Sequence, residues 1–409
     1  MQKLIFIFFI ILSLTYTKDI QYVLLISFDG FRYDYMDWVD TPNFDYIEKK
    51  GVKAASLQPV FPSLTFPNHY SIATGSYSDK HNITGNVFFD KKLDKTYSLY
   101  DKNSVRNPLF YKGEPIWVTA ERHGLNSASY FWVGTEAPIK GVSPSIFKYY
   151  DGSIPFEARI DSIISWFELD IKRRPQLSLL YFSEPDYTGH KYGVGKENII
   201  SSVVYMDSLL GYLLEKINIL EIRDNLNIII TSDHGMANVS SEKLLVLDEY
   251  INISNEIEIM GDGPFVQINY KGSKNKQFIS LFEDLKKIPY SKAWSKSEIP
   301  KRFHFVNENS GDFLLLANEG WFITTMENLN KKEFTLGGMH GYDPVLANMH
   351  GIFYAMGPQI KQNLKIKTFE NIHIYPLICK LLDILPYDDG IDQPDGKLEV
   401  LQPILDIRE

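Results

Sequence analysis

The stretch YVLLISF at Tyr22–Phe28, followed at once by Asp29 and Gly30, is the segment that decides the fold. Its apolar residues run without polar alternation, which is typical of a strand buried on both faces of a parallel sheet. Similar apolar runs lie at Leu177–Phe182 (LSLLYF), Leu226–Thr231 (LNIIIT) and 352–356 (IFYAM). Helical patterns lie between the runs, for example at 156–169 and 198–220. We therefore predict an α/β fold with a mainly parallel sheet flanked by helices.

The segment from about residue 242 to 336 interrupts this alternation. It is rich in lysine and aromatic residues and carries short strand-like pieces at Phe265–Tyr270, 312–316 and 321–324. We predict a small β-rich lobe there, inserted before the last strands of the core. Residues 18–409 are otherwise predicted as one domain, since no repeat, low-complexity tract or flexible linker divides them.

The composition is that of a globular protein, with 44% hydrophobic and 23% charged residues among 409. The net charge of −9 argues against a nucleic-acid scaffold, which would carry a basic face. A small anionic substrate is still compatible with it, because a metal ion can supply local positive charge. The single cysteine, Cys379, lies in an apolar stretch and predicts a buried structural thiol, with no disulfide inside the chain.

Residues 1–17 have the pattern of a secretory signal peptide. Lys3 precedes an apolar run at 4–14 that only Ser13 interrupts, and small residues follow it. That run is too short to cross a bilayer, which needs about 20 residues, and no later segment is long and apolar enough. Sequons for N-glycosylation stand at Asn82, Asn238 and Asn252. We expect a secreted or lumenal protein with no membrane span in the mature chain.

Metal-ligating residue types follow the predicted strands. Asp29 ends the first strand, Asp186 follows the second, and Asp233 and His234 follow the third. Ligands bind at the carboxyl ends of strands in open α/β sheets. His190 stands four residues after Asp186, on the same face of a helical turn, and Gly235 lets the chain turn so that both neighbouring ligands serve one site. A further ligand, His340, lies in the glycine-rich stretch GGMHG.

Oxygen and imidazole ligands without thiolate suit a catalytic Zn²⁺ site. Each of these residues has an ordinary explanation when taken alone, such as a helix cap or a core histidine. The joint pattern on three strand ends is what predicts metal binding. We assign the structural reading to the remaining isolated histidines, His81, His123, His304, His350 and His373.

A hydroxyl nucleophile is available in the segment FPSLTFPN, residues 61–68. Either Ser63 or Thr65 could serve, since a hydroxyl becomes a good nucleophile only when a base or a metal activates it. The flanking prolines Pro62 and Pro67 restrict the backbone around it.

These motifs together resemble the nucleotide pyrophosphatase/phosphodiesterase family of the alkaline phosphatase superfamily. The resemblance covers residues 22–385 and has the family's order throughout. It is carried by SFDGFR at 27–32, TFPNH at 65–69, GN at 85–86, YKGEPIW at 111–117, EPD at 184–186 with GH at 189–190, SDHGM at 232–236 and HG at 340–341.

The resemblance implies an alkaline phosphatase-like core and two zinc ions per chain. Thr65 matches the nucleophile that takes the phosphoryl group and forms a covalent intermediate. One zinc is implied to be held by Asp186, His190 and His340, and the other by Asp29, Asp233, His234 and the Thr65 oxygen.

The resemblance also implies a substrate pocket. Asn86 matches the amide that donates to a non-bridging phosphate oxygen. Phe66 and Tyr150 match an aromatic pair that sandwiches a nucleobase, and Trp132 and Tyr181 match further walls. The implied activity is hydrolysis of nucleotide phosphodiester or phosphoanhydride bonds, releasing nucleoside 5′-monophosphates. The expected partner is a small nucleotide, and no protein partner is inferred.

Some positions depart from the family pattern. Leu64 stands where the family commonly has lysine, and the family's nucleotide-contacting lysine falls near Val105 and Arg106. Larger members also carry disulfides, which a chain with one cysteine cannot form.

Other functions compete with this reading. A phosphomonoesterase would be expected to clasp a terminal phosphate with arginine, and a sulfatase would need a C/S-x-P-x-R motif that neither Cys379 nor Ser63 begins. A binding protein derived from such an enzyme would show broken ligand positions, whereas all six are present. A choline-phosphodiester hydrolase with the same metal core stays open as the alternative, since an aromatic cage with carboxylates would bind its quaternary ammonium.

Overall fold

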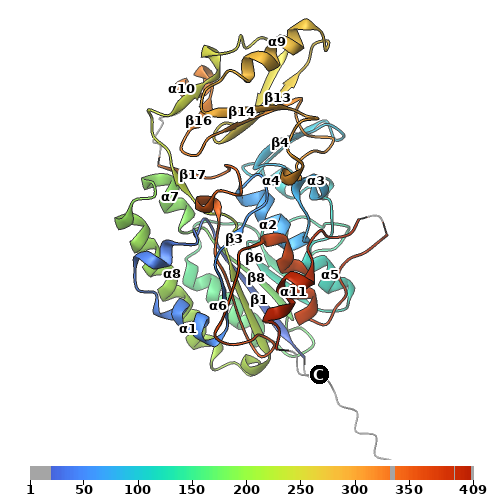
Figure 1. The fold of residues 1–409 in the computed structure, drawn as a ribbon. Helices are drawn as coiled ribbons and strands as arrows, with labels where there is room; N and C mark the ends of the chain where they lie inside the picture. Colours follow the sequence, from blue (N-terminus) through green and yellow to red (C-terminus); the bar gives the residue numbers. More distant parts are fainter. Residues whose placement is uncertain (1–19, 332–336, 391, 407–409) are drawn as a thin grey trace, which may run out of the picture.

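The computed structural model describes residues 20–331, 337–390 and 392–406, so the predicted signal peptide lies outside the described residues. An eight-stranded sheet forms the centre of the larger part of the molecule (Figure 1). Its strands, in spatial order, are β19 (Leu364–Ile366), β2 (Val52–Ala54), β18 (Phe353–Met356), β9 (Leu226–Thr231), β1 (Tyr22–Phe28), β8 (Leu177–Phe182), β6 (Ser127–Tyr130) and β7 (Ile146–Lys148).

The centre of this sheet is parallel, as the continuous apolar runs predicted. β1 pairs in parallel with β8 on one side and with β9 on the other. The run at 352–356 differs from the prediction, because β18 pairs antiparallel with both β9 and β2. An apolar run shows that a strand is buried on both faces, and a strand so buried can run in either direction.

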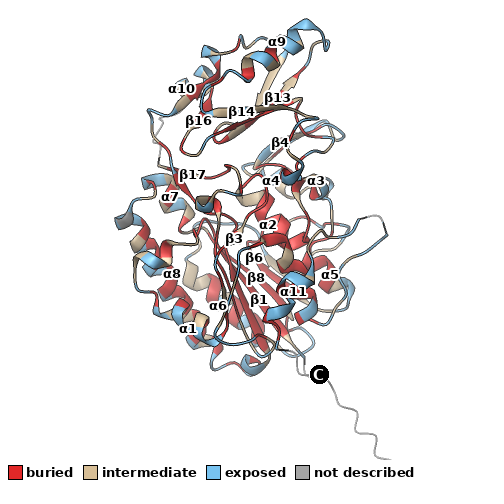
Figure 2. Ribbon diagram, viewed as in Figure 1, coloured by how far each residue is buried: buried red, intermediate tan, exposed pale blue. Residues whose placement is uncertain are grey.

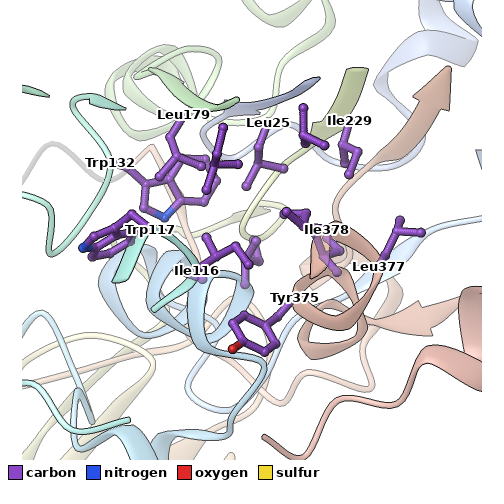
Figure 3. Close-up of a cluster of buried hydrophobic side chains, with 14 of the residues drawn as sticks. Leu25, Ile116, Trp117, Trp132, Leu179, Ile229, Tyr375, Leu377 and Ile378 are labelled. Atoms are coloured by element: carbon purple, nitrogen blue, oxygen red, sulfur yellow. The ribbon is translucent and has the colours of Figure 1, made fainter. Parts of the chain in front are cut away.

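Both faces of the sheet are covered by helices, so the strands lie in the buried interior (Figure 2). On β1, Leu24, Ile26 and Phe28 join a cluster with α1 (Pro42–Lys50), α6 (Phe156–Phe167) and α8 (Lys196–Ile217). Val23 and Leu25 point to the other face. There they join a cluster with α2 (Thr65–Thr74), α5 (Ile116–Arg122) and α11 (Ile374–Leu381), part of which is drawn in Figure 3.

The predicted helices at 156–169 and 198–220 are α6 and α8. Cys379 lies on α11 as a free, buried cysteine. Burial raises the pKa of its thiol to about 12. None of the helices within the described residues combines the length and the apolar character needed to span a bilayer.

A second, antiparallel sheet lies apart from the first, at the top of Figure 1. It has four strands, in the order β12 (Ile257–Met260), β13 (Phe265–Tyr270), β15 (Phe313–Ala317) and β14 (Ser291–Ser295). The helix α9 (Lys276–Leu285) packs Leu281 and Leu285 into the hydrophobic cluster of this sheet. Nearby are β11 (Leu244–Val246), which pairs with β16 (Phe322–Thr324), and α10 (Met326–Lys331).

Short elements connect the two sheets. α7 (Asp186–Tyr192) and the pair β10 (Ala237–Asn238) and β17 (Gly338–Met339) lie between them (Figure 1). The remaining strands and α-helices are β3 (Leu57–Gln58) paired with β20 (Phe369–Glu370), the hairpin β4 (Val87–Asp90) and β5 (Lys95–Ser98), and the short helices α3 (Ser78–His81), α4 (Lys102–Val105) and α12 (Leu398–Leu401).

Candidate metal and active site

The carboxyl ends of the three central parallel strands bring the predicted ligands together. The Asp29 N–H donates to the carbonyl of Phe182 at 2.9 Å, and the Asp186 N–H donates to the carbonyl of Asp29 at 3.0 Å. Between them Gly30 has φ +64°, and a Cβ there would lie 2.8 Å from Asp186 Cβ. Only glycine therefore allows the ends of β1 and β8 to approach this closely.

One group of ligand atoms consists of Asp186, His190 and His340. The Nε2 atoms of His190 and His340 are 3.0 Å apart. The Asp186 carboxylate lies 3.5 Å from each of them, through Oδ2 to His190 and Oδ1 to His340. α7 supplies the first two residues, and the third follows β17.

A second group surrounds His234. Its Nε2 atom lies 2.9 Å from Asp233 Oδ2, 3.5 Å from Asp29 Oδ1 and 3.2 Å from Thr65 Oγ1. The ring of His234 also stacks on that of His340, with centroids 3.5 Å apart. The two groups are therefore contiguous, and His234 lies between them.

The three imidazoles share one orientation. Each has its Nδ1 atom 2.8–3.0 Å from a backbone carbonyl oxygen, which can only accept a proton. Nδ1 is therefore a protonated nitrogen in each ring, so that a neutral ring with this orientation presents the lone pair of Nε2 to the centre of the site. The carbonyls belong to Gly338 for His190, Gly235 for His234 and Ser63 for His340.

Neighbouring charges at this centre change the pKa values of several of its groups. Burial, together with Asp233 and Asp186, raises the pKa of Asp29 well above its ordinary value. Burial would also raise the pKa of Asp233, but His234 and His69 hold it below its ordinary value. Burial lowers the pKa of His340 well below its ordinary value, and the neighbouring His234 adds to this. Burial would also lower the pKa of His234, but Asp233 holds it above its ordinary value. The centre thus concentrates negative charge that favours a positively charged group.

A cation is the group that this donor set fits. Among the described residues, Asp29 Oδ1, Asp186 Oδ1 and Asp233 Oδ2 are buried without a hydrogen-bond donor. Their nearest neighbours include the Nε2 atoms of His234 and His340, and buried carboxylates are stable only when paired or bound to a metal. Imidazole nitrogen and carboxylate oxygen are ligands typical of Zn²⁺ at catalytic sites.

His69 is a neighbour of this centre that the sequence analysis did not single out. Its Nδ1 lies 3.4 Å from Asp233 Oδ2, yet it donates to the Thr65 carbonyl at 2.9 Å, and Nε2 lies 2.8 Å from Ser27 Oγ. Both ring nitrogens are engaged by the protein, so His69 orients the site and is not free to bind a metal. The sequence signal that could have identified His69 is its position four residues after Thr65, which places the two residues on the same face of α2.

Thr65 is the first residue of α2, with its side chain partly exposed. The positive end of the helix dipole therefore lies at this hydroxyl. One residue further on, the Phe66 N–H donates to Asn86 Oδ1 at 3.1 Å. Because the amide oxygen of Asn86 is engaged, its Nδ2 group is the part that is left to donate to a ligand.

A cavity of about 380 Å³ opens onto these residues. Its wall includes every residue of the predicted substrate pocket, Phe66, Asn86, Trp132, Tyr150 and Tyr181, together with Thr65, Asp29, Asp186, His190 and His340. Phe66 and Tyr150 therefore share one cavity with the candidate nucleophile. Tyr150 is half-exposed, and its ring packs on Phe131 with centroids 5.1 Å apart.

Two of the aromatic residues have contacts that the sequence did not predict. The hydroxyl of Tyr181 donates to Asp29 Oδ2 at 2.5 Å, and Trp132 Nε1 donates to the His69 carbonyl at 3.1 Å. Both are buried. They therefore support the candidate metal-binding residues as well as forming walls of the cavity.

Arg106 and Lys102 also line the cavity, near the place where the family's lysine was expected. Arg106 Nε donates to Glu136 Oε2 at 2.8 Å, and the other carboxylate oxygen of Glu136 accepts the Tyr150 N–H at 2.8 Å. A basic residue is thus present on this wall, paired with a carboxylate.

The chain matches known proteins over most of its length. Residues 23–343 match the family model described as type I phosphodiesterase/nucleotide pyrophosphatase. The human ectonucleotide pyrophosphatase/phosphodiesterase family member 1 is 35% identical over 373 residues, which cover 89% of this chain and 40% of that protein. Human family member 5 is 37% identical over 377 residues, covering 91% of this chain and 77% of that protein.

A solved structure of murine ectonucleotide pyrophosphatase/phosphodiesterase 5, an inactive variant in complex with AMP, superposes with a TM-score of 0.87 at 34% identity. The alignment covers 94% of this chain and all of that one. The predicted alkaline phosphatase-like α/β fold is confirmed by this agreement and by the mainly parallel sheet. The chain spans less than half the length of several curated relatives it matches.

Proposed function

The chain belongs to the type I phosphodiesterase/nucleotide pyrophosphatase family, and on that basis we propose that it is a two-zinc phosphodiesterase acting on nucleotides. It would cleave phosphodiester or phosphoanhydride bonds and release nucleoside 5′-monophosphates. The observation that carries this proposal is the position of the Thr65 hydroxyl. It lies 3.2 Å from His234 Nε2, at the start of a helix and in one cavity with two aromatic side chains.

The donor set supports two metal positions. Asp186, His190 and His340 would hold one zinc, and Asp29, Asp233, His234 and the Thr65 oxygen would hold the other. His234 lies close to both groups, and Asp186, His234 and His340 by themselves place ligand atoms within 4.8 Å of one another. Bound zinc would supply positive charge beside the reacting oxygens and lower the pKa of a coordinated hydroxyl.

Residues of the chain itself would carry out nucleophilic attack and stabilise the transition state. The Thr65 hydroxyl loses its proton and its oxygen attacks phosphorus, the bond to the leaving group breaks, and the nucleoside 5′-phosphoryl group becomes esterified to Thr65. Water then hydrolyses this ester, which releases the nucleoside 5′-monophosphate and restores the Thr65 hydroxyl. The amide of Asn86 donates to a non-bridging oxygen, a role typically worth about 2.7–4 kcal/mol in the transition state. The N-terminus of α2 adds favourable charge at the same oxygens.

A nucleotide is the substrate class that the cavity favours. Phe66 and Tyr150 can stack on a base, and stacking tolerates every base because each has a π-face. The murine relative was solved with AMP. A choline head group would need a carboxylate free to face a quaternary ammonium, whereas Glu136 on this wall is paired with Arg106.

The test is hydrolysis of ATP beside glycerophosphocholine by the zinc-loaded protein, with products identified by mass. We expect AMP and pyrophosphate, and little choline product. Release of choline phosphate with ATP untouched would keep the metal centre and overturn the nucleotide assignment. If the protein binds zinc but hydrolyses neither substrate, the proposed activity is overturned.

We also propose the expected localisation and domain arrangement. Residues 1–17 would direct the chain to the secretory pathway and be cleaved off after residue 17, and residues 18–409 would form the phosphodiesterase domain with an inserted lobe at about 242–336. Mass analysis of the protein secreted by a eukaryotic host tests the cleavage. Retention of residues 1–17 on the secreted protein would contradict it.

A further inference from the structure

Arg159 is a buried cation beside the substrate cavity that the proposed chemistry does not use. It lies in the first turns of α6 with no exposed surface. Within the part of the chain that the structure describes, Arg159 makes no ion pair with a carboxylate, and its guanidinium meets carbonyls and aromatic rings instead. A buried charge without a counter-charge is costly, so the contacts that retain it indicate its role.

The guanidinium joins two segments of the cavity wall. Its Nη1 group donates to the carbonyl of Tyr181 at 2.9 Å. Its Nε and Nη2 groups both donate to the carbonyl of Ile154, at 3.3 and 3.2 Å. The first carbonyl belongs to β8, and the second belongs to the loop that follows Tyr150. Arg159 therefore ties that loop to the strand.

Two aromatic rings complete the environment of Arg159. Its Cζ atom lies 4.5 Å from the ring centroid of Phe156 and 5.0 Å from that of Phe131. Phe131 has φ +71°, a left-handed conformation that a bulky residue rarely adopts and that must be held by its surroundings. The ring of Phe131 packs in turn on that of Tyr150. Arg159 thus supports Tyr150 in two ways, through the ring of Phe131 and through the loop that contains Ile154.

Tyr150 is half-exposed, and its ring contacts those of Phe131 and Tyr181. We infer that Arg159 is a positioning residue, which holds Tyr150 in place to stack on the base of a nucleotide substrate. This inference rests on the proposed function. A planar guanidinium can span the two carbonyls at once, whereas the single ammonium of lysine cannot reproduce the fork.

The experiment compares two substrates of the zinc-loaded protein, one with a base and one without. Thymidine 5′-monophosphate p-nitrophenyl ester carries a base, and bis(p-nitrophenyl) phosphate does not. For Arg159→Lys we expect the KM of the thymidine ester to rise about tenfold with kcat within about twofold, since stacking acts on binding. The kcat/KM of the baseless ester should stay within about twofold of wild type.

A double-mutant cycle with Tyr150→Ala isolates the link between the two residues. If Arg159 acts through Tyr150, Arg159→Lys should change the KM of the thymidine ester less than twofold once Tyr150 is alanine. Ile163→Val, a buried change on the same helix, is the matched control for general destabilisation and should leave both substrates unaffected.

The outcomes separate the inference from the proposed function. Equal losses on both substrates, or full additivity in the cycle, would overturn the positioning role of Arg159. A Tyr150→Ala variant with an unchanged KM for the thymidine ester would overturn it as well, because Tyr150 would then not stack on the base. A wild-type protein that cleaves neither ester would overturn the proposed function instead. If Arg159→Lys does not fold, Arg159→Met, which removes the charge, is compared with wild type on the same two esters.

Discussion

Removing one hydroxyl, by Tyr181→Phe, should weaken zinc binding while leaving the cavity wall in place. The Tyr181 hydroxyl donates to Asp29 Oδ2 at 2.5 Å, and both side chains are buried. A hydrogen bond to a charged group contributes about 1.5–3 kcal/mol, and each 1.4 kcal/mol corresponds to tenfold in affinity. The expected loss is therefore about 10- to 100-fold, the range usual for groups that orient metal ligands.

The assay is a zinc titration of the metal-free protein against a chromophoric competitor, followed by activity at saturating zinc. The phenyl ring of the variant still fills the wall, so kcat at saturating zinc should stay within about threefold of wild type. The matched control is Tyr354→Phe, on β18 and away from the site. The buried hydroxyl of Tyr354 donates to the Sδ atom of Met36, so this change also removes one buried hydrogen bond.

Two results would refute the reasoning. A zinc affinity within about threefold of wild type would mean that Tyr181 does not orient Asp29 for the metal. An equal loss in the Tyr354→Phe control would mean that the effect reflects general stability.

Three further predictions follow from other residues. Thr65→Ala should abolish turnover with both zinc ions still bound, as read by metal analysis, and activity within about tenfold of wild type would reject Thr65 as the nucleophile. Burial lowers the pKa of His81 from 6.5 to about 3, and the ring accepts the Ile83 N–H, so the unfolded chain takes up the proton first as the pH falls. Stability relative to His81→Asn should therefore drop by about 2 kcal/mol between pH 7 and pH 5 in denaturant titrations, and a pH-independent difference would contradict this. In protein secreted from a eukaryotic host, glycan mapping should find Asn252 occupied, because it is exposed. Asn82 should be bare, because its buried amide donates to Asp90 and to the Phe110 carbonyl, so a glycan on Asn82 in folded protein would count against the structure.

The strands at the centre of the sheet could be predicted from sequence to the residue. β1, β8 and β9 have the predicted bounds, because each is a continuous apolar run bounded by polar residues and turns. The direction of β18 could not be predicted, since burial on both faces leaves the same pattern in either direction.

For the candidate site, the ligand types at strand ends were visible in the sequence, but the contacts among them were not. The hydrogen bond from Tyr181 to Asp29 depends on the register in which Tyr181 pairs with Ser27, and no local pattern encodes that register. The same holds for His69, whose ring reaches Ser27 across 42 positions of the chain. The roles of the site residues remain predictions that the experiments above test.

The place of His340 along the chain has a consequence for stability. The chain leaves the core after His234, forms the antiparallel sheet, and returns to place His340 against His234. The zinc proposed for Asp186, His190 and His340 would close a loop of roughly 150 residues between His190 and His340, as a disulfide would in a chain with more than one cysteine. Zinc supply would then set how firmly the antiparallel sheet is anchored to the core.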